Sequence, residues 1–346
     1  MCNRLKVFCE TMEKPIGVDN AAPRFSWRPD TEHVCRPQKA YQISVYEGGC
    51  RVWESGEVQS GASTMVPYRG EALRSFTEYR VAVISVLADG AVYRGEGSFE
   101  TGILTQSEWR GDFLCYPRYE KRQAPVFVWQ FRVGPDVSRV RAYFCGLGYG
   151  ELSVNGCKAD DSVLDPAWTN YNQRVLCRTL DVTRLVQTGD NKARILLGDG
   201  WMAHNHRYFR PKPPLPWYHE PCFLLNIRVT YRNGDVEILY PDEESCRANT
   251  SEILSQNLFD GEEYSAERAD ELQQQEAGEL LEADGWIAPA RTEIAGVRRS
   301  QLMQPIRETE VIEPVRIASI QASTYVVDMG VNFSGYARVT VAGEKG

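Results

Sequence analysis

The residues with the clearest capacity for chemistry lie between positions 196 and 220, in the stretch LLGDGWMAHNHRYFRPKPPLPWYHE. This stretch holds His204, His206 and His219, which are three of the four histidines of the chain. On a strand, the His-x-His spacing places both rings on one face, where they could bind a metal ion. Because no carboxylate or thiolate stands at a matching spacing, the pattern argues against a metal site.

The same stretch has the residue types of a carbohydrate site. Sugars present apolar ring faces edged by hydroxyl groups, so proteins hold them with aromatic rings flanked by carboxylates and amides. That mixture occurs in DPAWTNYNQRV and again in GDGWMAHNHRYF. The candidate sugar-binding residues in these two segments are Trp168, Asn170, Asp199, Trp201, His204 and His206. The alternative is that Trp168 and Trp201 pack in the protein core.

Other catalytic patterns are missing from the sequence. It contains no G-x-S-x-G nucleophile elbow and no phosphate-binding loop of the G-x-x-x-x-G-K type. The segment CGLGYG has the glycines of a nucleotide-binding turn, but it lies between two predicted strands and no helix follows to bind phosphate. Neighbouring carboxylates such as Asp160-Asp161, Glu243-Glu244 and Glu262-Glu263 are typical of a solvated surface, so no catalytic dyad is identified.

Strand patterns dominate the elements that must position these residues. In the first hundred residues, Tyr41, Ile43 and Val45 share one face, and residues 79–85 alternate in the same way. Short strands with a turn every ten residues or so predict a β-sandwich. Trp27 in an early strand and Tyr79 at the start of a late one are typical of a fibronectin-III-like core.

A boundary is predicted near residues 103–112, where the alternation is lost. Beyond it, residues 125–133 alternate again, and VRAYFCGLGYGELSVNGCKA predicts two strands joined by a glycine-rich turn. Asn233-Gly234 predicts a tight hairpin turn between two alternating runs. The expected helix is short, at residues 266–275. Ala337, Val339 and Val341 predict a last strand that pairs with residues 309–328 before a Gly-Glu-Lys-Gly turn.

Composition excludes several classes of protein. The 346 residues are 42% hydrophobic and 25% charged, as in soluble globular proteins, and no apolar run is long enough to cross a membrane. The net charge of -8 includes a strongly acidic segment at 241–284, which argues against nucleic acid as a partner. Ten cysteines without C-x-x-C spacing are expected to be mostly reduced. No signal peptide is visible, so the expected compartment is the cytoplasm or the periplasm.

A series of motifs resembles a known family. In order along the chain they are PIGVDNAAPRFSWRP, AYQISVY, VWESGEV, SFETGIL, YFCGLGYGELSVNG, LDPAWTNYNQRV, LDVTRLVQTGDN, LLGDGWM, FDGEEYSAER and VVDMGVNFSGYARVTVAG. Together they resemble the front half of bacterial α-L-rhamnosidases of the large inverting glycoside hydrolase family. Each motif alone is weak, but ten in order across the chain are specific.

The resemblance implies three β-modules. They are a fibronectin-III-like sandwich at residues 1–105, a jelly-roll domain at 106–300 and the first strands of a further β-sandwich at 301–346. It also implies that the catalytic (α/α)6 barrel lies beyond this sequence and hydrolyses terminal α-L-rhamnose with inversion. The expected partners are therefore a rhamnose-containing glycan and the catalytic domain of the same chain. The alternatives are a free-standing carbohydrate-binding module protein and a related glycoside hydrolase or lyase with another specificity.

Some relatives bind rhamnose through calcium in the jelly-roll domain. The resemblance would place the polar residues of such a site near Asp160 and Asp161, which join the candidate sugar-binding residues. The loop that follows GDGWM departs from the family, because FRPKPPLPWYHE is rich in proline and lacks the expected asparagine and glycine. No cofactor is therefore expected, and calcium at Asp160 and Asp161 is the one exception to test.

Overall fold

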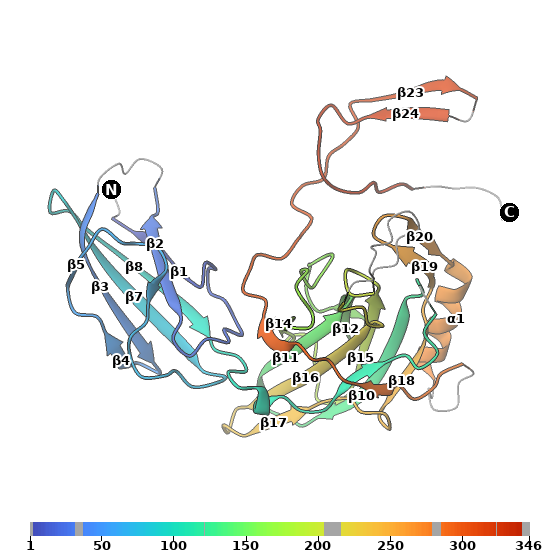
Figure 1. Ribbon diagram of the computed structural model, residues 1–346, viewed down its shortest axis with the longest axis horizontal. Helices are drawn as coiled ribbons and strands as arrows, with labels where there is room; N and C mark the ends of the chain where they lie inside the picture. The colour runs from blue at the N-terminus through green and yellow to red at the C-terminus, as the bar shows by residue number, and fades with distance from the viewer. Residues whose placement is uncertain are drawn as a thin grey trace. The chain divides into compact units, whose positions relative to one another are not determined.

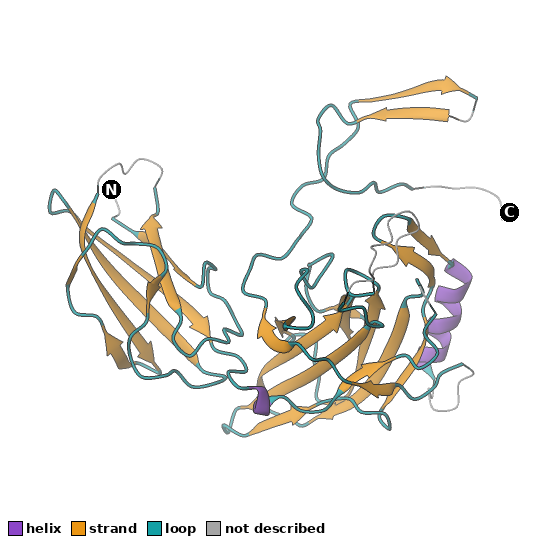
Figure 2. Ribbon diagram, in the orientation of Figure 1, coloured by secondary structure: helices purple, strands orange, loops and turns teal. Residues whose placement is uncertain are grey.

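The structure is a computed structural model, and it describes residues 3–31, 37–120, 122–203, 216–278, 285–322 and 324–340. The chain divides into two compact units. The first comprises residues 1–160 and 164–304, and the second comprises 161–163 and 305–346. Strands account for most of the regular structure, as Figure 1 and Figure 2 show, so the prediction of tandem β-sandwiches is confirmed.

The first part of unit one, here called the N-terminal sandwich, consists of two antiparallel sheets. The three-stranded sheet has the order β1-β2-β6, and the five-stranded sheet has the order β4-β3-β7-β8 with β5 paired to β3. The strands are β1 Leu5–Cys9, β2 Arg24–Pro29, β3 Gln38–Glu47, β4 Cys50–Glu54, β5 Val58–Gln59, β6 Val66–Pro67, β7 Glu78–Leu87 and β8 Val92–Glu100.

The alternating residues of this sandwich face its core, as predicted. Tyr41, Ile43 and Val45 of β3 are buried, and so are Trp27 of β2 and Tyr79 of β7. The Tyr79 hydroxyl also accepts a hydrogen bond of 3.0 Å from the Arg74 amide, which satisfies a polar group at the edge of the core. The period of two therefore identified the buried face.

The remainder of unit one, here called the central sandwich, is built from two larger sheets. One has the order β13-β12-β15-β10-β18, and the other has the order β21-β9-β16-β11-β14-β22 with β17 paired to β16. The strands are β9 Phe113–Cys115, β10 Pro125–Val133, β11 Val137–Leu147, β12 Tyr149–Val154, β13 Cys157–Lys158, β14 Arg174–Asp181, β15 Gly189–Gly198, β16 Cys222–Tyr231, β17 Val236–Leu239, β18 Cys246–Thr250, β21 Ala290–Thr292 and β22 Val297–Ser300.

Strand β10 shows how the sequence pattern maps onto this sandwich. Its inner residues, which include Phe127 and Trp129, lie in the core between the two sheets. Its outer residues Val126 and Val128 pack under helix α1, Ala266–Ala277, through Leu272. The remaining elements of unit one are the 3-10 helix η1, Gln106–Glu108, and a hairpin of β19, Ile253–Asn257, and β20, Gly261–Tyr264. The predicted helix and the predicted hairpin at Asn233-Gly234 are both confirmed.

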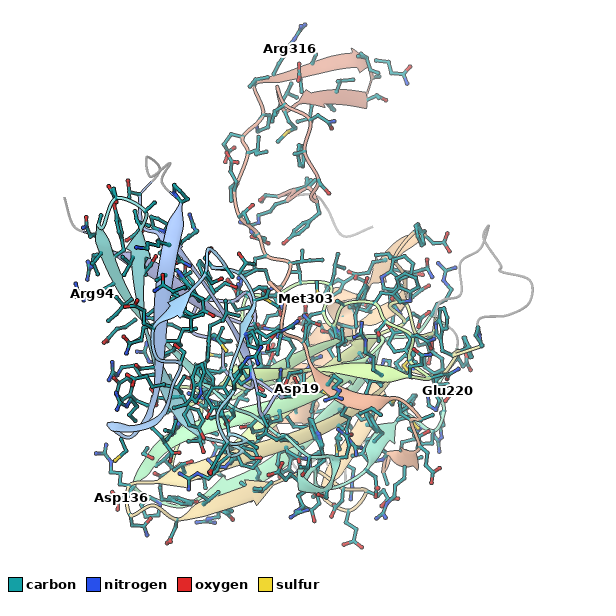
Figure 3. The ribbon with its side chains drawn as sticks, turned by 60° about the vertical axis from the view of Figure 1, so that its left-hand side comes forward. Asp19, Arg94, Asp136, Glu220, Met303 and Arg316 are labelled. Atoms are coloured by element: carbon teal, nitrogen blue, oxygen red, sulfur yellow. The ribbon has the colours of Figure 1, made fainter. Side chains whose placement is uncertain are left out.

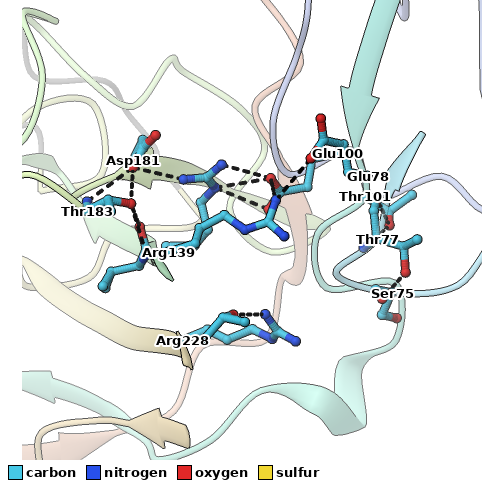
Figure 4. Close-up of polar contacts among 12 residues, drawn as sticks. Ser75, Thr77, Glu78, Glu100, Thr101, Arg139, Asp181, Thr183 and Arg228 are labelled. Atoms are coloured by element: carbon cyan, nitrogen blue, oxygen red, sulfur yellow. Dashed lines mark hydrogen bonds and ion pairs between the residues drawn. The ribbon is translucent and has the colours of Figure 1, made fainter. Parts of the chain in front are cut away.

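Glu100 joins the N-terminal sandwich to the outer face of the seven-stranded sheet. Its buried carboxylate accepts hydrogen bonds from Arg141 Nε at 3.1 Å and Nη2 at 2.9 Å, and from Arg139 Nη1 at 3.0 Å. Figure 4 shows Glu100, Arg139 and Asp181 in this network, with dashed lines for its hydrogen bonds and ion pairs. Arg141 also forms an ion pair of 2.8 Å with Asp181. Because a buried charge needs such partners, this network favours one fixed arrangement of the two sandwiches.

A second set of contacts crosses the same interface. Asp19, labelled in Figure 3, accepts a hydrogen bond of 3.0 Å from the Ser300 amide. Gly17 has a φ of 79° and lies so close to Thr179 that a Cβ at this position would overlap the threonine side chain. Glycine is required here by both the backbone conformation and the close approach.

The second unit holds one antiparallel hairpin, β23 Arg316–Gln321 with β24 Thr324–Asp328. Many of its apolar side chains are exposed, including Ile317, Tyr325 and Val339. Strands resume near Ile317 as predicted, but the predicted last strand is wrong for residues 336–340, which are irregular. Alternation alone does not make a strand, because the backbone groups need a pairing partner. Residue 341 and the predicted Gly-Glu-Lys-Gly turn lie outside the described residues. In the described part of the chain, no helix is long and apolar enough to cross a membrane.

Candidate functional site

Two glycine-rich segments position the candidate site at one end of the central sandwich. Gly148 and Gly200 both have positive φ, of 81° and 49°. A Cβ on Gly148 would overlap the Gly198 carbonyl oxygen, and a Cβ on Gly200 would lie 2.7 Å from the Gly148 carbonyl oxygen. The glycines of CGLGYG and GDG therefore serve close backbone packing, which fixes the turn that carries Asp199 and Trp201.

Four aromatic side chains from three segments meet at this end of the sandwich, and we call them the aromatic cluster: Trp168, Trp201, Trp217 and Phe259. The Trp168 ring centroid lies 5.9 Å from that of Trp201 and 6.2 Å from that of Trp217. Phe259 stands edge-on to Trp201 at 6.0 Å. Trp168 is 60% exposed, so the alternative that it is a core residue is wrong, whereas Trp201 is half-buried.

The loop that carries Trp168 is held in place by hydrogen bonds. The amide of Ala167 donates to Gln301 Oε1 at 2.9 Å, and Gln301 Nε2 donates to Asp165 Oδ1 at 2.6 Å. Arg178 donates to Asp165 Oδ2 at 2.8 Å and also forms an ion pair with Asp160. These contacts order the loop before any ligand binds. A ligand that contacts the exposed ring of Trp168 would therefore cost the loop little conformational entropy.

Asp199 stands two residues before Trp201 in the chain and is only 1% exposed. Its Oδ1 accepts a hydrogen bond of 2.5 Å from the Tyr119 hydroxyl. Its Oδ2 makes no hydrogen bond of ordinary length, but the Gln256 side chain, whose Nε2 is buried, lies beside it and lowers the pKa of Asp199. Burial raises the pKa of Asp199 to about 6, although Tyr119, Gln256 and Arg122 partly offset the effect. A buried polar group without a partner is costly, so these neighbours stabilise Asp199 within the wall of the site.

The raised pKa makes a testable prediction about stability. Since the carboxyl group holds its proton more tightly in the folded state, it contributes stability that is complete below its unfolded pKa and is lost as the pH rises through about 6. We expect the free energy of unfolding of the wild type, relative to Asp199→Asn, to fall by about 2 kcal/mol between pH ~4 and pH ~7. Urea titrations across this range measure the difference. Parallel pH profiles for the two proteins would contradict the prediction.

The other predicted site residues have different outcomes. His204 and His206 lie outside the described residues. Asn170 is exposed, and its side chain accepts a hydrogen bond from the Asn172 amide. Asp161 belongs to unit two, where it forms an ion pair with Arg307. The structure thus brings Trp168, Trp201 and Asp199 together, and a sugar-binding role for all eight residues stays a prediction.

Calcium at Asp160 and Asp161 stays a prediction, and the surroundings of the two carboxylates argue against it. The Asp160 carboxylate pairs with Arg178, and the Asp161 carboxylate pairs with Arg307. Across the ranges that the structure describes, no group of three or more His, Cys, Asp or Glu side chains could hold a metal. Calcium usually requires six to eight oxygen ligands, and carboxylates engaged with arginine are poor candidates.

Sequence reasoning missed four residues of the site, namely Tyr119, Trp217, Gln256 and Phe259. Tyr119 lies in an irregular segment before β10, and Gln256 and Phe259 come from β19 and the turn that follows it. The hairpin of β19 and β20 is local, and it is held near Tyr119 by a long-range hydrogen bond of 2.8 Å from the Gln256 amide to the Arg122 carbonyl oxygen. The sequence feature that could have indicated Tyr119 and Trp217 is the aromatic content of YPRYE and PLPWY.

A polar groove lies elsewhere, at the end of helix α1 on the outer face of the five-stranded sheet. It has a volume of about 500 Å³, and its lining includes Arg132, Asp190, Lys192 and Glu276. These groups already contact one another. Arg132 pairs with Asp190 at 3.5 Å, and Lys192 Nζ donates to the Glu276 carbonyl at 2.8 Å. The aromatic cluster is therefore the better candidate for a ligand site.

Comparison with known proteins places the chain in a family. The family model described as the Alpha-L-rhamnosidase N-terminal domain matches residues 135–310, about half of the chain. The chain belongs to the alpha-L-rhamnosidase N-terminal domain family. A second family model, described as the Rha78A-like N-terminal immunoglobulin domain, matches residues 5–105. The rhamnosidase N-terminal domain thus includes the aromatic cluster, and the immunoglobulin match falls on the N-terminal sandwich.

Individual relatives agree with this assignment. An alpha-L-rhamnosidase of Formosa agariphila is 26% identical over 99% of this chain. The structure of an alpha-L-rhamnosidase from Dictyoglumus thermophilum, 26% identical, matches 94% of the chain with a TM-score of 0.78. The alpha-L-rhamnosidase of Streptomyces avermitilis complexed with L-rhamnose shares the fold, with a TM-score of 0.79 at 19% identity over 94% of the chain. The chain spans 39%, 38% and 49% of these three proteins.

Proposed function

We propose that this chain is the N-terminal, non-catalytic part of an α-L-rhamnosidase that hydrolyses terminal α-L-rhamnose with inversion. It supplies β-sandwiches at 1–105 and 106–300 and the start of a further β-module at 301–346. The observation that supports this proposal is the small share of each relative's length that this chain spans. The relatives match nearly all of this chain, yet the chain accounts for 39% of the Formosa agariphila enzyme. The hydrolytic residues are then contributed by a later part of the protein.

The geometry of the aromatic cluster supports binding in preference to hydrolysis. Inverting glycosidases need one carboxylic acid and one carboxylate on opposite sides of the scissile bond. Here Asp199 is buried and held by Tyr119, and Asp260 pairs with Arg122 at 3.3 Å. These two carboxyl groups support the walls of the site. We infer that the exposed face of Trp168 stacks on a sugar ring of a rhamnose-containing glycan.

The first test measures hydrolytic activity, and binding is measured separately. We expect the longer protein that carries this chain to release p-nitrophenol from p-nitrophenyl α-L-rhamnoside, whereas residues 1–346 alone release none. Release by residues 1–346 would show that hydrolysis occurs within this chain. A longer protein with no such activity would favour the alternative, a carbohydrate-binding module protein.

Binding is measured on residues 1–346 by tryptophan fluorescence. Because three tryptophans lie in the aromatic cluster, we expect titration with L-rhamnose to change the emission in a saturable way, with and without added calcium. D-glucose is the control sugar. No change at high concentrations of L-rhamnose would reject sugar binding at this site and would leave the proposed activity of the longer protein untouched.

A further inference from the structure

Two cysteines face each other across neighbouring strands of the seven-stranded sheet. In the antiparallel register of β11 and β14, Tyr143 pairs with Thr179 and Phe144 pairs with Arg178. The ladder ends at that pair, and extending its register by one residue places Cys145 opposite Cys177. Directly opposite residues of antiparallel strands have Cα atoms about 4.5–5.5 Å apart, which lies within the range of about 4.4–6.8 Å that a disulfide spans.

The two thiols are in contact and share one environment. Both side chains lie in a buried cluster on the outer face of the sheet, together with Leu147, Val175 and Met202. The Cys145 thiol lies against the Cys177 sulfur and, after burial itself, is the next cause that raises the pKa of Cys177. Cys145 Sγ also approaches the Leu176 carbonyl oxygen at 3.5 Å. Neither cysteine is in a disulfide in this structure.

We propose that Cys145 and Cys177 are a redox modification site and join in a cross-strand disulfide when a low-molecular-weight disulfide such as oxidised glutathione is present. One cysteine thiolate attacks a sulfur of glutathione disulfide and releases one glutathione thiolate. The other cysteine, after losing its proton, then attacks the mixed disulfide and releases the second glutathione. Two protein thiols are oxidised, and one glutathione disulfide is reduced to two molecules of glutathione.

Burial sets the rate of this reaction. A thiol reacts as its thiolate, and these side chains are shielded from solvent, so exchange requires the strand to open. β14 is close to the sheet edge, because its other neighbour β22 contributes only the four residues Val297–Ser300. Local opening of β22 and β14 gives access to the pair at lower cost than global unfolding.

The disulfide would act on the candidate site through the chain. β14 begins at Arg174, directly after the segment that carries Trp168 and Asn170. A covalent link from Cys177 to β11 holds the start of this strand in place. Oxidation therefore stiffens the segment that presents Trp168 to solvent. This inference does not depend on the proposed rhamnosidase function.

The same buried cluster contains a second pair of neighbouring cysteines, with which Cys145 and Cys177 can be compared. Cys115 of β9 and Cys222 of β16 are also register partners and also lie in the cluster.

A control variant is available at Cys246, which is equally buried but has Trp129 as its register partner. Cys246→Ala is therefore a matched control for Cys145→Ala, since each removes one buried sulfur.

The test is incubation of residues 1–346 with oxidised or reduced glutathione in moderate urea, followed by thiol counting in denaturant and peptide mapping without reductant. We expect the oxidised wild type to lose two thiols, to give a linked peptide containing Cys145 and Cys177, and to melt about 5 °C higher. Cys246→Ala should behave in the same way, and Cys145→Ala should yield no such link.

Two outcomes would overturn the proposal. One is a wild type that retains all its thiols after incubation long enough for exchange in urea. The other is a disulfide that maps to a different pair, whether Cys115 with Cys222 or the exposed Cys50 with Cys157. The peptide map of the wild type decides between the outcomes even if the Cys145→Ala variant fails to fold.

Discussion

Replacing Glu100 by alanine is expected to lower the free energy of unfolding by about 3 kcal/mol or more. The carboxylate is buried and accepts hydrogen bonds from both Arg139 and Arg141. Its removal leaves Arg141, whose side chain is 10% exposed, with Asp181 as its remaining ionic partner. An incompletely compensated buried charge is among the most destabilising changes a single substitution makes. Urea unfolding of residues 1–346 gives the difference.

The matched control for this prediction is Glu96→Ala on the same strand. Glu96 pairs with Arg80 at 2.6 Å, but the two side chains are 63% and 42% exposed. Exposed ion pairs contribute at most about 1 kcal/mol, so this variant should unfold almost as the wild type does. Equal losses of stability for Glu96→Ala and Glu100→Ala would show that the interface network has no special role. A Glu100→Ala protein that unfolds in two separate transitions would show that the network couples the two sandwiches.

The second large effect is expected at Trp168. Replacement by alanine should weaken binding of L-rhamnose about tenfold or more, because an exposed tryptophan that stacks on a ligand carries a large share of the binding energy. It should change the free energy of unfolding by less than about 0.5 kcal/mol, since the ring is 60% exposed. Isothermal titration calorimetry and urea unfolding measure the two quantities on the same preparations.

Tyr240→Ala is the control for the Trp168 variant. Tyr240 is an exposed aromatic residue of the central sandwich that lies outside the aromatic cluster. Its replacement should leave L-rhamnose binding unchanged. If Trp168→Ala binds the sugar as well as the wild type does, the aromatic cluster is not the sugar site. If both variants lose binding, the loss reports a general disturbance of the fold.

Local patterns predicted most of the strands correctly. In β3 and β7 the alternation of apolar residues marks the buried face, because side chains point to opposite sides of a strand with a period of two. Asn233-Gly234 predicted its hairpin because this dipeptide favours tight turns, and in the structure Gly234 supplies the positive φ of 92° that the turn requires. The segment after residue 330 shows the limit of this reasoning. Val339 alternates as a strand residue would, yet residues 336–340 are irregular.

The candidate site could be predicted only in part. Trp168, Asp199 and Trp201 were identified because aromatic and acidic residues cluster in two short segments. Gln256 and Phe259 were not, because their hairpin lies more than fifty residues further along the chain than Trp201. The glycines of CGLGYG could be excluded from nucleotide binding by their context, but their actual role in close backbone packing required the structure.

The sequence by itself determined the strand content, the buried faces, a short helix from residue 266 to about 275 and the resemblance to α-L-rhamnosidases, since each depends on local spacing or on motif order. Only the tertiary structure decided that Trp168 is exposed, that Glu100 meets Arg141 and that Cys145 faces Cys177. The physical reason is that these contacts depend on strand register and on the packing of one sheet against another. Both are set by the sum of many interactions between residues distant in the chain.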